Sequence, residues 1–393
     1  MQDGVLGLAR KGTLHLEAEA GDLVQWMASN IRFRLVTGDH DTRTVAPIEV
    51  GSGLQSLLDL AVLRGEHAAE GTDTILAVEE PEAFLHPSAQ RTLARALLQD
   101  DAVKRIVSTH SSALVDEASY GDVLLVRDHR IFPPRGSTDE RRREINTALM
   151  SGQGSEAMFA RSLLLVEGPG DKLFFETLRR RVARGDASHR ADELAVVHVG
   201  SNASFAPWIH LIESYQDPAT GERPIEWLVV ADAIDAPTEI ARALRDAGIS
   251  IAAELDSTLR AIQAANGAGD DASSIQSTHE FNRLAENAGL RVTLVPIDLE
   301  WCALQNTSRV TRNELAIVLG LPEGDRAAFL SRLGSKHDAG PIADPHKDPW
   351  MRAAIAGGLP WTEVSRDAKF VLRRWLLNAG IDEDSVIELL RRA

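Results

Sequence analysis

The sequence predicts an α/β protein with a parallel sheet, and two apolar runs that end in acidic residues are the main evidence. Residues 163–166 are four consecutive apolar residues, followed by Glu167 and a turn with two glycines. Residues 227–230 form a second apolar run, which leads into Asp232. Short apolar runs followed by helix-like periodicity are typical of buried parallel strands that helices connect. We therefore expect Glu167 and Asp232 at the ends of two strands of one sheet.

Length and composition limit the class of protein. The chain has 393 residues, enough for two or three domains, of which 44% are hydrophobic and 25% charged, as in ordinary globular proteins. No apolar run is long enough to cross a membrane. Cys302 is the only cysteine, which excludes a disulfide scaffold and Cys-rich zinc sites. We expect a protein of the reducing cytoplasm with no membrane segment.

The balance of charge limits how nucleic acid could bind. The formal net charge is −16, from 42 Lys and Arg against 58 Asp and Glu. This balance disfavours a protein that coats DNA over a wide surface. Nucleic acid would have to bind through local basic patches or through metal ions.

Changes in composition along the chain predict four parts. Residues 133–138 are polar and turn-rich, and α/β patterns occur on both sides of them. We predict a first domain over residues 1–135, a linker over 136–160, a second domain over 161–345 and a helical C-terminal segment over 346–393. Residues 266–277 are rich in Gly, Ala, Asp and Ser, so we expect an exposed loop or insertion there.

The acidic residues at the two predicted strand ends indicate a metal site. Ligands of open α/β sheets collect at the carboxyl ends of the strands. Asp171 follows Glu167 by four residues, and Asp235 lies close behind Asp232. Hard cations such as Mg²⁺ prefer carboxylate oxygens. This pairing of acidic strand ends resembles the Toprim domain of topoisomerases, primases and some nucleases.

Three short motifs in the first part of the chain suggest phosphate chemistry. Residues 51–56 form a turn of small residues that opens a helix, where backbone N–H groups can hold phosphate. Residues 75–78 are an apolar strand that ends in Glu79 and Glu80. In ATPases the first such acid holds Mg²⁺ and the second orients the attacking water. A further strand ends at His110, whose ring N–H can contact a γ-phosphate.

The order of these motifs resembles that in ABC-type ATPases of the RecF and SMC kind. On this resemblance the signature comprises Ser52, Gly53 and Gln55, the Walker B motif Glu79 and Glu80, the D-loop His86 and Pro87, and the switch His110. No Gly-x-x-x-x-Gly-Lys-[Ser/Thr] loop, which would hold the phosphates, occurs in the 393 residues. ATP would therefore bind only with a complementary P-loop, supplied by a partner or by a longer protein of which this chain is a part. The ATPase-like pattern of residues 5–45 favours the longer protein.

An ABC-type ATPase half followed directly by a Toprim domain resembles the overcoming-lysogenization-defect (OLD) family of nucleases, over roughly residues 46–301. The resemblance implies the C-terminal part of an ABC/RecF-like ATPase lobe, a Toprim domain with a Rossmann-like parallel sheet, and a helical C-terminal segment. Members are metal-dependent DNA nucleases linked to phage defence, and some act beside a Rep-type helicase. DNA is therefore the expected substrate, and a homodimer the expected assembly.

The resemblance also assigns site residues. Asp232 matches the first acid of an Asp-x-Asp motif, but the second acid falls on Ile234, so Asp235 is the nearest substitute. The implied ligands of Mg²⁺ or Mn²⁺ are Glu167, Asp171, Asp232, Asp235 and Glu300. The implied catalytic residues are Glu167, Asp232 and Lys336.

These features predict a divalent-metal-dependent DNA endonuclease or nickase with an attached ATPase-like regulatory domain. One cation would activate water, and Lys336 would neutralise charge on the transition state. The alternative is a non-catalytic subunit that acts as a binding or regulatory partner, because the Asp-x-Asp motif is degenerate and the P-loop is absent. A primase or topoisomerase is disfavoured, since neither Tyr120 nor Tyr215 has a recognisable topoisomerase setting.

Overall fold

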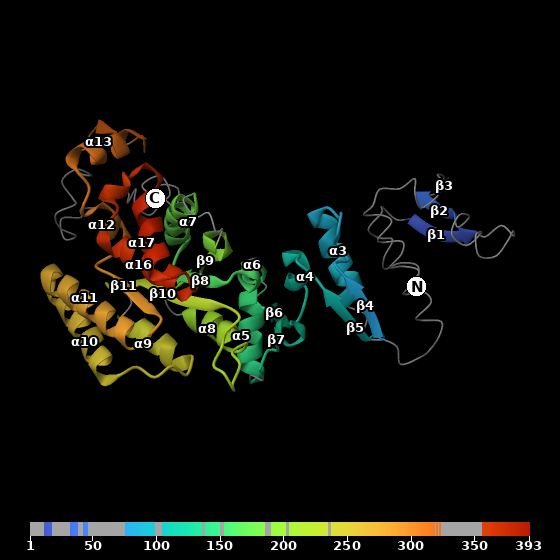
Figure 1. The fold of residues 1–393 in the computed structure, drawn as a ribbon, viewed down its shortest axis with the longest axis horizontal. Helices are drawn as coiled ribbons and strands as arrows, with labels where there is room; N and C mark the ends of the chain where they lie inside the picture. Colours follow the sequence, from blue (N-terminus) through green and yellow to red (C-terminus); the bar gives the residue numbers. More distant parts are fainter. Residues whose placement is uncertain are drawn as a thin grey trace. The chain divides into compact units, whose positions relative to one another are not determined.

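The chain divides into two units, Met1–Val123 and Leu124–Ala393, each of which is described by itself (Figure 1). The predicted domain boundaries at residues 135, 160 and 345 stay predictions. None of the helices in the described part of the chain is long and apolar enough to cross a membrane. The computed structural model describes residues 12–17, 32–37, 42–45, 75–98, 104–135, 138–149, 153–184, 190–201, 204–234, 237–318, 320, 322–323 and 356–393.

The first unit contains an antiparallel sheet and a parallel pair of strands. The antiparallel sheet has the order β1-β2-β3, and the parallel pair is β4 with β5. Leu93 and Leu97 of α3 pack against Leu76 and Val78 of β4, so one face of the parallel pair is covered. The elements are β1 (Gly12–Glu17), β2 (Arg32–Thr37), β3 (Thr42–Val45), β4 (Ile75–Glu79), α3 (Pro87–Leu98), β5 (Lys104–Ser108), α4 (Ser112–Asp116) and η3 (Tyr120–Asp122).

The second unit is built on a four-stranded parallel sheet with the order β11-β10-β8-β9. Its strands are β8 (Ser162–Val166), β9 (Leu194–His198), β10 (Glu226–Asp232) and β11 (Val292–Val295). Helices follow each of these strands in the sequence, as expected of parallel strands, which need crossover connections. The predicted α/β class with a parallel sheet is confirmed.

The remaining elements of the second unit surround this sheet. Before it come β6 (Leu125–Arg127), β7 (Arg130–Phe132), α5 (Asp139–Leu149) and α6 (Gly154–Phe159), so the range predicted as a linker contains two helices. The others are α7 (Pro169–Ala183), η4 (Arg190–Glu193), α8 (Phe205–Glu213), α9 (Pro237–Asp246), α10 (Ala253–Ala268), α11 (Asp271–Asn287), α12 (Leu299–Leu304), α13 (Arg309–Val318), η8 (Trp361–Glu363), α16 (Arg366–Asn378) and α17 (Glu383–Arg392).

Helices cover both faces of the sheet, which explains the uninterrupted apolar runs. All five residues of β8 are buried. Leu164 and Val166 of β8 share one core cluster with residues of α7 and α16, among them Phe175 and Trp375. Helix α8 packs against β10 from the other side (Figure 1). The predicted helical C-terminal segment is thus part of the core of this unit.

The loop expected over residues 266–277 is wrong, because two helices meet there. Helix α10 ends at Ala268, and the next residue, Gly269, has a φ of 70°, the left-handed conformation that commonly terminates helices. Asp270 then caps α11 by accepting a hydrogen bond from the backbone N–H of Ser273 at 3.1 Å. Only these two residues form the turn. The Ala and Ser residues beside them belong to helices.

A buried arginine ties the C-terminal helix to the sheet. Arg374 of α16 is only 6% exposed. Its Nη1 donates to the carbonyl of Val292 at 2.6 Å and to Thr293 Oγ1 at 2.7 Å, and its Nη2 donates to the carbonyl of Leu290 at 2.7 Å. Burial lowers the pKa of this guanidinium. The hydrogen bonds compensate for the loss of water and hold the start of β11 against α16.

Replacing Arg374 with Met should lower the melting temperature by roughly 5–10 °C, because three acceptors lose their donor inside the core. Arg373 is the matched control, since its ion pairs with Glu286 at 2.8 Å and Glu383 at 2.7 Å lie near the surface. Arg373→Met should change the melting temperature by at most about 2 °C. Scanning calorimetry measures both, and equal shifts would contradict a special role for Arg374.

Candidate functional site

Parallel pairing brings Glu167 and Asp232 to the same edge of the sheet. Val166 lies opposite Val230 in the register of β8 with β10, and Asp232 is the last residue of β10. Glu167 directly follows β8. Neighbouring strands lie about 4.8 Å apart. Two half-buried carboxylates therefore stand at the carboxyl ends of adjacent strands.

Asp171 stabilises the turn that connects Glu167 to α7. Gly168 is the N-cap of this helix, and its backbone N–H donates to Asp171 Oδ2 at 2.9 Å. The Asp171 side chain is buried, and a carboxylate in the first turn interacts favourably with the helix dipole. Asp171 thus has a structural role at this turn in addition to any contact with a cation.

The residues that follow β9 are hydrogen-bonded to the end of β8. The backbone N–H groups of Val199 and Gly200 donate to the carbonyls of Val166 and Glu167, both at 2.9 Å. Gly200 has a φ of 94°, a conformation that favours glycine. The glycine-bearing turn after β9 therefore lies directly beside Glu167.

Asp298 is an acid in the turn after β11 that the sequence reasoning missed. It immediately precedes α12, and the backbone N–H of Cys302 donates to its carbonyl at 2.9 Å. The pKa of the Cys302 thiol is raised, chiefly by complete burial and further by the negative charges of Asp367, Asp232 and Asp298. Asp232 and Asp298 therefore both lie near the same buried thiol. The rule that an acid at a strand end is a candidate ligand could have found Asp298.

The backbone before Asp298 is strained. Ile297 has a φ of 61°, which is rare for a β-branched residue. Such a conformation costs about 1–3 kcal/mol and persists only where the surroundings enforce it. Here the side chain is buried, and the carbonyl accepts a hydrogen bond from the backbone N–H of Ile234 at 3.1 Å. This bond connects the turn after β11 to the turn after β10.

Asn266 of α10 holds the turn that follows Asp232. Its Nδ2 donates to the carbonyl of Ala233 at 2.9 Å and, less closely, to that of Ile234 at 3.4 Å. Its Oδ1 accepts a hydrogen bond from Ser274 Oγ of α11 at 2.6 Å, and Ser274 is 1% exposed. The helical pair α10–α11 thus orients the backbone at the end of β10.

The complete set of predicted metal ligands stays a prediction. Asp235 and Lys336 lie outside the described residues, and Glu300 is placed in α12 with a side chain that is not described. Among the side chains that are described, no three or more His, Cys, Asp or Glu are close enough together to hold a metal ion. The acids at this edge offer only carboxylate oxygens, which suits a hard divalent cation.

The first unit brings two of the predicted ATPase residues together. His110 Nε2 lies 3.5 Å from Glu80 Oε1, and both side chains are exposed. Glu79 is the last residue of β4, and Glu80 has a φ of 42°. Ser52, Gly53 and Gln55 lie outside the described residues. The roles assigned to these residues stay predictions.

Glu82 holds the turn that contains His110, which the sequence reasoning also missed. Its Oε1 accepts hydrogen bonds from Thr109 Oγ1 at 2.5 Å and from the backbone N–H of His110 at 2.9 Å. The side chain is buried, at 8% exposure, although it follows two exposed acids in the sequence. A buried carboxylate on two donors fixes the backbone of the histidine turn.

Two regions of the chain match known domain families. Residues 32–116 match an AAA domain whose description also names the AbiEii toxin of a type IV toxin–antitoxin system. Residues 158–233 match the Toprim domain described as overcoming lysogenization defect protein-like. The second match begins just before β8 and includes Glu167, Asp171 and Asp232.

Similar proteins include the OLD nuclease of Thermus scotoductus, which is 30% identical over 171 residues, 39% of this chain and 31% of that protein. Endonuclease GajA of Bacillus cereus is 29% identical over 138 residues, 32% of this chain and 23% of that protein. The structure of the C-terminal region of the Xanthomonas campestris pv. campestris OLD protein has 15% identity and a TM-score of 0.34, over 60% of this chain and 93% of that one. The chain spans less than a third of the length of either curated relative. On the two domain matches and their order, the chain carries an AAA/ABC-type ATPase region followed by an OLD-like Toprim domain.

Proposed function

We propose that this chain is a divalent-metal-dependent DNA endonuclease or nickase whose ATPase-like region regulates cutting. The observation that supports this most is the placement of Glu167 and Asp232 at the carboxyl ends of neighbouring parallel strands, within the Toprim match. The names of the two relatives, OLD nuclease and endonuclease GajA, favour nuclease chemistry, and the family resemblance implies DNA as the substrate.

In this proposal Glu167 and Asp232 would hold Mg²⁺ or Mn²⁺, and Asp235 or Glu300 would complete the set. The bound cation supplies a water of lowered pKa and neutralises charge on the phosphate. Asp171 keeps the Glu167 turn in place through the backbone N–H of Gly168. Lys336 neutralises charge on the transition state, as the family resemblance implies.

The ATPase-like region would bind ATP only with a complementary P-loop, through Ser52, Gly53, Gln55, Glu79, Glu80 and His110. A homodimer, a Rep-type helicase as partner, and a role in phage defence belong to the same proposal. The competing proposal is a non-catalytic binding subunit, which Ile234 at the second Asp-x-Asp position favours. Metal binding and DNA cutting distinguish the two.

Glu167→Ala should abolish metal-dependent nicking, because it removes a carboxylate from the edge where the cation would bind. Supercoiled plasmid is incubated with the purified chain and Mg²⁺ or Mn²⁺, without nucleotide, and nicked product is measured. Glu314→Ala, which removes an exposed acid from α13, is the control and should cut like the parent. Equal cutting by Glu167→Ala and the parent would exclude Glu167 as a ligand. Absence of cutting by the parent would favour the non-catalytic subunit.

Mn²⁺ at about 100 times its dissociation constant should stabilise the parent by about 2.7 kcal/mol, a rise in melting temperature of roughly 5–10 °C. Asp232→Asn should reduce this rise, because an amide is a weaker ligand than a carboxylate. Asp384→Asn, an exposed position on α17, should keep it. Thermal melts with and without Mn²⁺ measure the rise, and the same rise in Asp232→Asn as in the parent would rule out this ligand.

Asn266→Ala should raise the Mn²⁺ concentration needed for half-maximal stabilisation by about 10–100-fold, because residues that orient ligands have effects of this size. The substitution removes the hydrogen bonds from Asn266 to the turn after Asp232, but it removes no carboxylate. Asn313→Ala, at an exposed position on α13, is the control. A lower melting temperature in EDTA combined with an unchanged Mn²⁺ requirement would mean that Asn266 stabilises the fold but does not position the ligands.

A further inference from the structure

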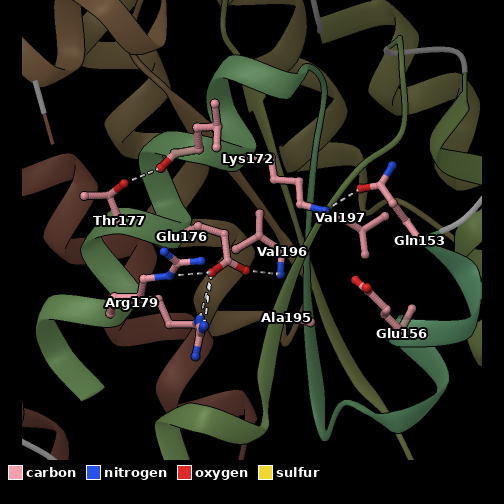
Figure 2. Close-up of a pocket in the computed structure, with 12 residues that line it drawn as sticks. Gln153, Glu156, Lys172, Glu176, Thr177, Arg179, Ala195, Val196 and Val197 are labelled. Atoms are coloured by element: carbon pink, nitrogen blue, oxygen red, sulfur yellow. Dashed lines mark hydrogen bonds and ion pairs between the residues drawn. The ribbon is translucent and has the colours of Figure 1, made fainter. Parts of the chain in front are cut away.

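A cavity of about 380 Å³ lies along β9, the edge strand of the Toprim sheet, between residues of α6 and α7. Figure 2 shows its side chains, with Lys172 reaching from α7 to Gln153. Its charged lining residues are Glu156, Lys172, Glu176, Arg179 and Arg180. Cations exceed acids in this lining by one, although the whole chain has a net charge of −16.

The two arginines that line this cavity interact with a carboxylate, whereas the lysine interacts with a neutral amide. Arg179 Nη2 pairs with Glu176 Oε2 at 3.1 Å, and Arg180 Nε lies 3.9 Å from the same carboxylate oxygen. Lys172 Nζ instead donates to the neutral amide Oε1 of Gln153 at 2.8 Å. Within the described part of the chain, no carboxylate lies at ion-pair distance from Lys172. The Gln153 amide occupies one of the three donor positions of this side chain, so two remain for another acceptor.

Gln153 is fixed on the edge of β9. Its Oε1 accepts a hydrogen bond from the backbone N–H of His198, and its Nε2 donates to the carbonyl of His198, both at 3.3 Å. The amide thus pairs with His198 as the peptide group of a further strand would. A side chain held at both ends of its amide offers a rigid acceptor to Lys172.

Lys172 lies beside the carboxylate edge of the sheet. It follows Asp171 in the first turns of α7, and its backbone N–H donates to the carbonyl of Gly168 at 3.1 Å. The pKa of His198 at the end of β9 is lowered by burial and then by the charge of Lys172, so the ammonium is near that strand end. A cation at a helix N-terminus is unfavourable by itself, because the helix dipole is positive there. An anion bound beside the Lys172 ammonium and the N-terminus of α7 would be attracted by both positive charges and would remove this penalty.

We propose that Lys172 binds a backbone phosphate of the DNA strand that enters the Toprim site, and that Gln153 is the positioning residue that holds Lys172. This inference rests on the proposed nuclease function and adds a substrate contact to it. The acids at the neighbouring strand ends are expected to bind the cation that acts on DNA. The anion that reaches Lys172 beside them would therefore be a phosphodiester of the same DNA. A lysine is a compact point charge that suits a single phosphate.

The test is equilibrium binding of a labelled DNA duplex in EDTA over a range of salt concentrations, with plasmid nicking in Mn²⁺ measured in parallel. Lys172→Gln should weaken binding about tenfold and lower the slope of log K against log salt by about 1. Lys172→Arg should keep most of the affinity. Arg260→Gln is the control for net charge, since Arg260 is an exposed, ion-paired residue of α10.

Gln153→Glu gives an independent test that leaves Lys172 in place. The new carboxylate would pair with the ammonium and cancel its charge, so DNA binding should weaken as in Lys172→Gln. If both variants melt like the parent and bind DNA like Arg260→Gln while the parent binds and nicks, the Lys172 contact is wrong and the nuclease proposal stands. If the parent neither binds nor nicks DNA, both proposals are overturned.

Discussion

The register between β8 and β10 is the constraint on which the candidate site depends. Because Val166, the last residue of β8, lies opposite Val230, Glu167 and Asp232 both reach the same edge of the sheet. Packing fixes this register: a slip of one residue would turn Leu164 and Val166 away from the core cluster that they share with α7 and α16. The apolar layers therefore determine where the carboxylates stand.

The strands of this sheet could be predicted from the sequence because each is a short apolar run bounded by turn residues. Their order could not, since it depends on contacts between segments far apart in the chain. The helical pair α10–α11 could not be predicted from residues 266–277 because the buried side chains that fix these helices, such as Leu259, Ile262 and Phe281, lie outside that stretch. Its composition alone suggested a loop.

In the candidate site, too, local sequence predicts some residues, whereas others depend on contacts between distant segments. Glu167 and Asp232 follow apolar runs, so local pattern was enough to select them. Asp298 was missed because the family resemblance assigned Glu300 as the ligand in this segment, whereas the chain turns at Ile297 with a φ of 61°, just before Asp298. Gln153 and Asn266 have no local signal at all. The backbone carbonyls to which they donate, of His198 and Ala233, are 45 and 33 residues away, so only the folded chain reveals their positioning roles.

The groups that contact each arginine and lysine side chain explain how an acidic chain could bind DNA. Arg374 donates hydrogen bonds to buried carbonyl and hydroxyl oxygens, and Arg179 forms an ion pair with Glu176. Lys172 is held by an amide, which orients an ammonium without cancelling its charge. Such a cation can meet a phosphate group although the whole chain has a net charge of −16. Since a DNA backbone interacts with nearby charges and salt screens distant ones, the pairing of individual cations matters more for binding than the total.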